Sequence, residues 1–286
     1  MRYEAPSSLE KAVALLAQAP GETRVLAGGT DLLVQMKTDL VEPELLVDIK
    51  GIAELRQIKE EAGGFRIGAA VSGAELKEHP RLKSVWPGVV EAANLIGSTQ
   101  IQGRASMGGN LCNGSPAADS VPALIAASAK ASVVGPKGRR DVPVEDIMIG
   151  PRRLSLAKGE IVASFLLPPK SARSGDAYLR FIPRTEMDIA VVGCGVCVTL
   201  DARGVCSAAR VSLGAVAARP LLVAPAAAAL IGSRLEDAAM QRLDAAARAA
   251  CQPIDDKRGT KEYRIKVAGV LARRAAQIAL ERARKS

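Results

Sequence analysis

Two glycine-rich stretches carry the residue types best suited to holding a phosphate group. The first is Ala27-Gly28-Gly29-Thr30-Asp31-Leu32, which follows a short apolar stretch and precedes residues that can begin a helix. Small residues let a ligand approach the backbone closely, and successive N–H groups near a helix start can point at one anion. The same sequence also makes an ordinary strand-to-helix turn, with Thr30 or Asp31 as the N-cap. The residues alone leave both interpretations open.

The second stretch runs from Gly97 to Asn110 and contains Ser106-Met107-Gly108-Gly109-Asn110. It is so rich in glycine and small polar residues that we expect neither a helix nor a regular strand. We expect residues 111–120 to continue as a loop until an apolar helix begins near Val121. An irregular segment of this length inside a compact domain usually lines a ligand site.

The remaining candidates for chemistry are the cysteines and the single histidine. The chain has five cysteines, and this odd number argues against a disulfide framework. Cys194 and Cys197 match a C-x-x-C motif, but they lie in an apolar stretch that predicts a strand, on which positions three apart face opposite sides. We therefore expect buried core cysteines and no metal or iron–sulfur site there. His79 precedes Pro80 near the end of a predicted helix, where we expect a surface residue or a partner of the helix dipole, not a catalyst.

The bulk properties exclude several classes of protein. The net charge is +9, but lysine and arginine are spread along the chain and are not interleaved with aromatic residues, so we do not expect nucleic-acid binding. A basic protein can instead favour an anionic cofactor or acidic partner subunits. No apolar run is long enough to span a bilayer, and the first residues lack the apolar segment of a signal peptide. These features predict a cytoplasmic protein.

Hydrophobic periodicity and turn residues predict the elements that position the two stretches. Near the N-terminus, Ser7 or Ser8 caps a helix and residues 24–26 form a strand that enters the first glycine turn. A second unit begins near Ile52, and residues 170–175 form a linker to the last part of the chain. Further strands are predicted at 43–49, 65–71, 131–134, 138–142, 161–167, 177–182, 189–200 and 208–213, and further helices at 32–36, from Ser72, up to Leu95, at 235–249 and at 262–284.

Taken together, the motifs resemble the FAD-binding medium subunit of the molybdenum hydroxylases, the carbon monoxide dehydrogenase-like and xanthine dehydrogenase-like enzymes. The pair of turns that contain Gly28-Gly29 and Gly108-Gly109 is far more specific than either turn alone. The resemblance covers essentially the whole chain. It also rests on Ser115-Pro116-Ala117-Ala118-Asp119, on the opening Tyr3-x-x-Pro6-x-Ser8-Leu9, on Arg184-x-Glu186-x-Asp188-Ile189-Ala190 and on Glu262-Tyr263-Arg264.

The resemblance implies an α+β fold with three parts. The first two are the subdomains of an FAD-binding domain of the vanillyl-alcohol-oxidase/MurB (PCMH) type, at residues 1–52 and 53–170. The third is a smaller α/β C-terminal domain of the carbon monoxide dehydrogenase flavoprotein type, at residues 176–286. FAD would lie extended and non-covalently bound between the two subdomains.

The resemblance also implies how the site residues are used. The first turn would hold the pyrophosphate through backbone amides, and the second would complete the cradle from the other subdomain. Asp119 would lie on the adenosine side, while Leu156 and Arg180 would lie near the isoalloxazine. The residues implied as FAD contacts are Ala27, Gly28, Gly29, Thr30, Asp31, Leu32, Thr99, Ser106, Gly108, Gly109, Asn110, Asp119, Leu156 and Arg180.

The sequence departs from the family pattern at two places in the second stretch. The family often has Ile-Arg-Asn where this chain has Ile101-Gln102-Gly103, which removes a charge at position 102 but not the backbone cradle. The usual threonine before Gly-Gly is Ser106 here, which keeps the hydroxyl group. Nothing resembles the cysteine-rich insertion of some relatives, so we expect this chain to hold flavin only.

The function that the resemblance implies is electron transfer in a larger complex. Substrate would react at molybdenum in a large molybdopterin subunit, and a small subunit with two [2Fe–2S] clusters would connect it to this FAD and then to an external acceptor. The assembly would be a dimer of such heterotrimers. One alternative is a self-contained MurB-like reductase or oxidase, which needs its own acid or base near the flavin. Another is a nucleotide-binding or scaffold subunit that has lost flavin, against which the intact glycine pairs argue.

Overall fold

Local signals explain where most helices begin. Ser8 caps the first helix by accepting a hydrogen bond from the Lys11 N–H, and Ser72 forms a reciprocal capping box with Glu75. Pro80 and Pro87 each occupy the first position of a helix, where the missing N–H costs no hydrogen bond. The computed structural model describes all residues, 1–286.

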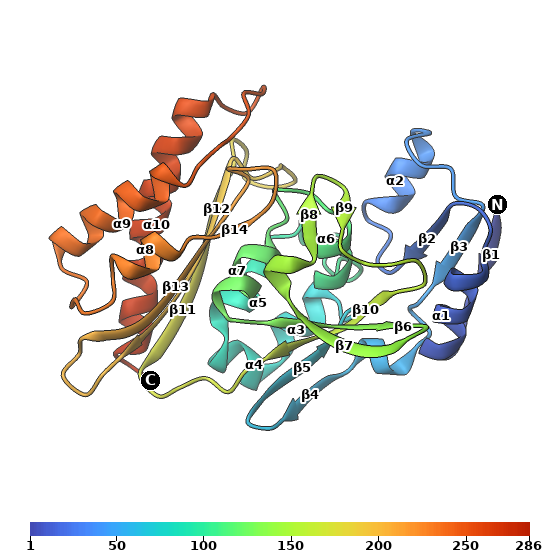
Figure 1. The fold of residues 1–286 in the computed structure, drawn as a ribbon, viewed down its shortest axis with the longest axis horizontal. Coiled ribbons are helices and arrows are strands. Elements are labelled where there is room, and N and C mark those ends of the chain that lie inside the picture. Colours follow the sequence, from blue (N-terminus) through green and yellow to red (C-terminus); the bar gives the residue numbers. More distant parts are fainter.

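The N-terminal subdomain is a three-stranded parallel sheet, drawn in blue at the right of Figure 1. Its strand order is β1-β3-β2, which leaves β2 as an edge strand beside the first glycine turn. Strand β1 was not predicted, because three residues with little burial give no periodic signal and form a strand only through pairing with β3. The elements are β1 (Arg2–Glu4), α1 (Leu9–Gln18), β2 (Thr23–Leu26), α2 (Leu32–Lys37) and β3 (Leu45–Asp48).

The second subdomain, coloured from blue-teal (β4, β5) through green to yellow-green (β10) in Figure 1, is an antiparallel sheet of order β4-β5-β10-β6-β7 with helices packed on it. Its core joins apolar residues of β5, β6 and β10 to the helices α3 to α7. The sheet elements are β4 (Ile58–Glu61), β5 (Gly64–Gly68), β6 (Lys130–Gly135), β7 (Gly138–Pro143) and β10 (Ile161–Leu167). The rest are η1 (Ala53–Arg56), α3 (Gly73–Glu78), α4 (Pro80–Val85), α5 (Pro87–Asn94), α6 (Met107–Cys112), α7 (Ser120–Ala126), η2 (Val144–Asp146), β8 (Met148–Gly150) and β9 (Arg153–Leu154).

The C-terminal part is an antiparallel sheet of order β11-β12-β13-β14, with α8 to α10 on the face away from the second subdomain (Figure 1). Its other face contacts α5 and α7. The helix pattern predicted near the C-terminus is confirmed, since Ala268, Leu271 and Ala275 are buried. The elements are β11 (Ser174–Phe181), β12 (Val192–Leu200), β13 (Cys206–Gly214), β14 (Leu221–Leu222), α8 (Ala224–Ala228), α9 (Asp237–Ala249) and α10 (Lys261–Ala283).

Two expectations from the sequence were wrong. The predicted linker 170–175 overlaps β11, because Ser174 and Gly175 pair with Thr199 and Val198 and the strand extends against α10. The second glycine stretch is not a loop throughout, because residues Met107–Cys112 form the short helix α6. Helical backbone is favoured there because Ser106 caps it and because glycine at position 108 permits contact with Ala69.

No helix combines the length and the apolar composition that a membrane span requires.

Candidate functional site: a cavity between two glycine turns

The structure brings the two glycine stretches together. If Gly28 carried a Cβ atom, that atom would lie 2.1 Å from the carbonyl oxygen of Arg104, so the first turn contacts the backbone just before α6. A cavity of about 610 Å³ lies between the two turns, within the range of ordinary ligand sites. Ala27 to Leu32, Ser106, Gly108 to Asn110 and Leu156 line it.

The first turn presents unpaired hydrogen-bond donors. The backbone N–H groups of five consecutive residues, Gly28 to Leu32, have no acceptor in the protein. Asp31 occupies the N-cap position of α2, but its side chain makes no capping hydrogen bond. Its carboxyl group lies at the cavity, where desolvation raises its pKa. Because backbone donors are rarely left without a partner, the turn is well suited to an anionic group.

The second turn differs, because its amides already have partners inside the protein. The Gly108 N–H donates to the Ala69 carbonyl oxygen at 3.1 Å, and the Gly109 N–H donates to Ser106 Oγ at 3.1 Å. The Asn110 N–H donates to the Ser106 carbonyl oxygen at 2.9 Å. A ligand in the cavity therefore meets the first turn through backbone N–H groups, and meets α6 through side chains and through the open surface of Gly109.

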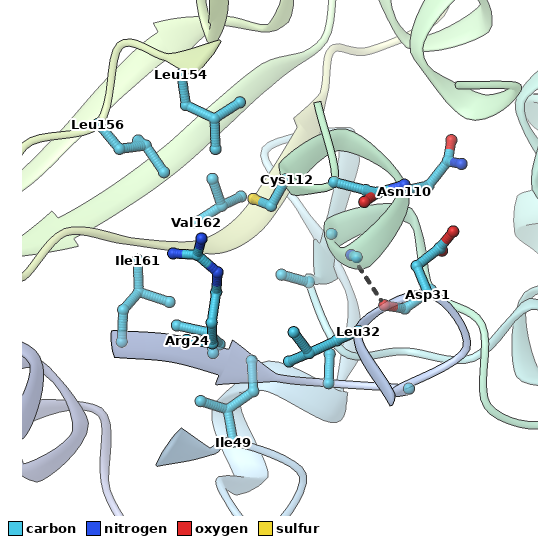
Figure 2. A pocket seen from close by; sticks show the side chains of 18 of the residues that line it. Arg24, Asp31, Leu32, Ile49, Asn110, Cys112, Leu154, Leu156, Ile161 and Val162 are labelled. Atoms are coloured by element: carbon cyan, nitrogen blue, oxygen red, sulfur yellow. Dashed lines mark hydrogen bonds between the residues drawn. The ribbon is translucent and has the colours of Figure 1, made fainter. Parts of the chain in front are cut away.

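Aliphatic side chains form a further wall of the cavity. Figure 2 shows Leu154, Leu156, Ile161 and Val162 on one side, with Leu32 and Ile49 on another. Such a wall suits the face of a flat ring system, while the unpaired N–H groups suit an anion. The combination fits the two kinds of group in a flavin dinucleotide.

Three cations of the lining were not identified from the sequence: Arg24, Arg152 and Lys158, whose ammonium group donates to the Ala19 carbonyl oxygen at 2.6 Å. Arg24 points into the cavity from the edge strand β2 (Figure 2), where it is ion-paired with Glu22. Arg152 lies in the β8–β9 turn, and its side chain makes no hydrogen bond or ion pair with protein atoms; its backbone has a positive φ of 56°. Its N–H donates to the Gly114 carbonyl oxygen at 2.8 Å, which fixes the turn beside the end of α6. No motif marks these residues, because isolated cations have no distinctive spacing in the sequence, and the structure alone places them at the cavity.

Three of the predicted contacts lie outside the lining of the cavity: Thr99, Asp119 and Arg180. Thr99 is exposed in the loop after α5. Asp119 and Arg180 form a nearly buried ion pair, with 2.8 Å between Oδ2 and the guanidinium, and Tyr178 donates a hydrogen bond to Asp119 Oδ1 at 3.0 Å. The structure therefore pairs Asp119 and Arg180 with each other, at 2.8 Å, a contact that the sequence did not predict.

Burial dominates the ionisation of Asp119. Desolvation raises the pKa of Asp119 to about 6, against the opposing effects of the Arg180 charge and the Tyr178 hydrogen bond. The carboxyl group therefore remains ionised at neutral pH, as its ion pair requires.

The histidine and the C-x-x-C cysteines, which are the other residues considered for catalysis or metal binding, have structural roles. His79 links two helices, because its Nδ1 accepts a hydrogen bond from the Leu82 N–H at 3.1 Å. Cys194 packs in the C-terminal core and Cys197 packs against the core of the second subdomain, so their thiols diverge as predicted. Cys112 does line the cavity, where desolvation raises the pKa of its thiol above the ordinary value.

Comparison with known proteins gives a consistent result. The FAD-binding domain family of molybdopterin dehydrogenases matches residues 1–170, and the C-terminal domain family of carbon monoxide dehydrogenase flavoproteins matches residues 177–279. The carbon monoxide dehydrogenase medium chain of Hydrogenophaga pseudoflava is 35% identical over 280 residues, covering 98% of this chain and 97% of its own. The xanthine dehydrogenase FAD-binding subunit of Escherichia coli O157:H7 is 33% identical over 268 residues, or 92% and 90% of the two chains.

Solved structures show the same similarity. Reconstituted carbon monoxide dehydrogenase from Oligotropha carboxidovorans contains a chain that superimposes with a TM-score of 0.94 at 35% identity. The match covers 99% of this chain and 98% of that one.

Proposed function

Because this chain belongs to the FAD-binding medium subunits of the carbon monoxide dehydrogenase- and xanthine dehydrogenase-type molybdenum hydroxylases, we propose that it is the electron-transfer flavoprotein of such a complex. Bound FAD would supply the redox chemistry, receiving electrons from iron–sulfur clusters and passing them to an external acceptor. The chain itself would bind this cofactor, orient it and exclude water from it.

The observation that carries the proposal is the row of unpaired N–H groups from Gly28 to Leu32 beside an aliphatic wall. We infer that the N–H groups hold the diphosphate of FAD and that Leu154, Leu156, Ile161 and Val162 pack on a ring. Ser106, the N-cap residue of α6, and Asn110, within α6, contribute polar side chains. Ala27, Thr30, Gly108 and Gly109 complete the proposed contacts without adding charge.

Thr99, Asp119 and Arg180 would contact the part of the cofactor that extends beyond the enclosed cavity. Ile96 lines the cavity three residues before Thr99, and Asn110 lines it while hydrogen-bonded to Ser120, the neighbour of Asp119. The Arg180 guanidinium would lie near this end of the cofactor, held by Asp119.

We propose that the partners are a large molybdopterin subunit and a small subunit with [2Fe–2S] clusters, assembled as a dimer of heterotrimers. The similarity to medium chains of carbon monoxide dehydrogenase over nearly the full length supports this assembly. A cytoplasmic location follows from the same proposal.

Co-purification tests the function. Tagged chain expressed with its native partners should bring down one larger and one smaller polypeptide, with molybdenum, iron and FAD. The chain purified alone should be yellow after incubation with FAD and should show no turnover with aldehydes or N-heterocycles and an artificial acceptor. Full turnover by the chain alone would instead support the self-contained flavoenzyme, and failure to bind FAD would refute the proposal.

A further inference from the structure

The side chain of Asn110 has a fixed orientation in the cavity wall. Its Oδ1 accepts two hydrogen bonds from Ser120, one from the backbone N–H at 3.0 Å and one from Oγ at 2.7 Å. A backbone N–H can only donate, so the carboxamide atom that faces it must be the oxygen. The NH₂ group of Asn110 therefore points away from Ser120.

The NH₂ group of Asn110 is left free on the side of the cavity. Asn110 lines the cavity, and its Nδ2 makes no hydrogen bond to the protein and is not among the buried polar atoms without a partner. Two N–H donors are thus available to a ligand, close to the second glycine pair.

Both hydrogen-bond donors of Ser120, its backbone N–H and its hydroxyl group, donate to Asn110 Oδ1. It is fully buried at the first position of α7, and neither its N–H nor its hydroxyl group donates to any other protein atom. The residue before it, Asp119, is held from strand β11 by Tyr178 and Arg180. The start of α7 is therefore anchored to the C-terminal sheet while Ser120 holds Asn110.

We propose that Ser120 is a positioning residue of the cofactor site. Its two hydrogen bonds keep the Asn110 carboxamide with its NH₂ group toward the cavity, where this group donates to the anionic diphosphate of the bound dinucleotide. The inference rests on the proposed function as an FAD-binding subunit. Ser120 itself does not touch the cofactor.

Equilibrium binding of FAD and of ADP to the apoprotein tests the proposal, with flavin fluorescence as the readout for FAD and calorimetry for ADP. Ser120→Ala should raise the Kd for both ligands ~5-fold, and Asn110→Ala should raise both ~10-fold, the loss expected for a hydrogen bond to a charged group. Asn110→Asp should raise both by ~100-fold, because the carboxylate still accepts from Ser120 and turns its second oxygen toward the phosphates.

A double-mutant cycle separates positioning from general destabilisation. In the Asn110→Ala background, Ser120→Ala should change neither Kd by more than ~2-fold, because Ser120 acts only through Asn110. Ser212→Ala is the matched control: Ser212 is equally buried, its hydroxyl group has no partner, and it lies in the C-terminal sheet. That variant should bind both ligands like the wild type.

Several results would overturn the inference. Effects of Ser120→Ala and Asn110→Ala that multiply in the double variant would show that Ser120 acts on binding independently of Asn110. Weakened binding of FAD with unchanged binding of ADP would place Asn110 away from the diphosphate. If Ser120→Ala does not fold, unchanged affinity in Asn110→Asp refutes the proposal by itself. Wild-type chain that binds no FAD would refute the proposed function, which is a distinguishable outcome.

Discussion

At the scale of single residues, the glycines of the two stretches are under different steric constraints. Gly28 and Gly108 are needed by the fold, because a Cβ at either position would collide with backbone, at Arg104 and Ala69 respectively. Gly109 faces a different constraint, since a Cβ there would meet only Ser106 Oγ, at 3.3 Å, and would extend into the cavity that Gly109 lines. We therefore propose that Gly109 leaves room for a ligand.

This difference predicts separate outcomes for two alanine variants. Gly109→Ala should keep the thermal stability of the apoprotein near that of the wild type but reduce FAD affinity ~10-fold or more. Gly108→Ala should destabilise the apoprotein by about 1–3 kcal/mol through overpacking. Thermal unfolding and flavin titration on both variants check this. Gly103→Ala is the control, because a Cβ there meets nothing within 4 Å.

The Arg152 side chain lines the cavity and has no hydrogen-bond acceptor or ion-pair partner in the protein. Removing its charge can test whether it contacts the cofactor. Arg152→Ala should weaken FAD binding ~3–10-fold and make it less sensitive to salt, because one charge-assisted contact to a phosphate is lost. Arg153→Ala is a matched control, since Arg153 is the exposed neighbour and does not line the cavity. Equal effects of the two substitutions on FAD affinity and its salt dependence would contradict a specific contact.

At the scale of elements, the start of α7 is the junction between the cavity and the C-terminal sheet. Asp119 precedes this helix, and its partners Tyr178 and Arg180 both come from β11. The contacts explain why a strand of the C-terminal part contributes Tyr178 to the core of the second subdomain. Helix α7 thus holds Asn110 on one side and β11 on the other.

The raised pKa of Asp119, about 6, predicts a pH dependence of stability. Because the folded state holds the proton more tightly than the unfolded chain, stability contributed by Asp119 is complete below pH 4 and is lost as the pH rises toward 6. The free energy of unfolding of the wild type minus that of Asp119→Asn should fall by roughly 2 kcal/mol between pH 4 and pH 6.5. Urea unfolding of both apoproteins at pH 4 and at pH 6.5 measures the difference. Parallel pH profiles would contradict the assignment.

At the scale of the whole molecule, the three larger sheets follow one another along the long axis, and α5 and α7 lie between the second sheet and the C-terminal sheet (Figure 1). The cavity lies between the first two sheets, and the C-terminal sheet supports it from behind through α5 and α7. Ion pairs such as Arg282 with Glu91 and Lys170 with Asp176 connect the C-terminal part to the second subdomain. All residues that line the cavity come from the first two parts, and the C-terminal sheet is connected to the cavity wall through Asp119 and Ser120 at the start of α7.

Close packing between β12 and α7 provides a test of this docking. A Cβ at Gly195 would lie 2.4 Å from the Pro122 carbonyl oxygen, so Gly195→Val should force the sheet away from α7. We expect a loss of about 1–3 kcal/mol and faster proteolysis between residues 168 and 173. Gly51→Val is the control, because the nearest atom to a Cβ there lies at 4.0 Å. Unfolding with an unchanged midpoint and unchanged cleavage would show that docking does not depend on this contact.

Much of the fold could be predicted because its signals are local. The Ser72–Glu75 capping box, the helix-starting prolines and the alternation of the long strands depend on residues close in sequence. Helix α6 could not be predicted, because glycine disfavours helix locally and the Ala69 carbonyl that accepts from Gly108 lies far away in the sequence. The ion pair of Asp119 with Arg180 could not be predicted for the same reason, since it joins positions 61 residues apart.

The sequence by itself determined that two glycine-rich stretches exist, and its resemblance to a family implied that they hold one cofactor. Residue size and backbone freedom at Gly28-Gly29 and Gly108-Gly109 are properties of the amino acids, so they can be read without coordinates. Only the tertiary structure decided which turn offers free donors. The N–H groups of Gly108 and Gly109 donate to the Ala69 carbonyl oxygen and to Ser106 Oγ. The N–H groups from Gly28 to Leu32 have no protein acceptor and lie at the cavity. Whether a backbone N–H group has an acceptor depends on which residues pack beside it, and this packing is set by the whole fold.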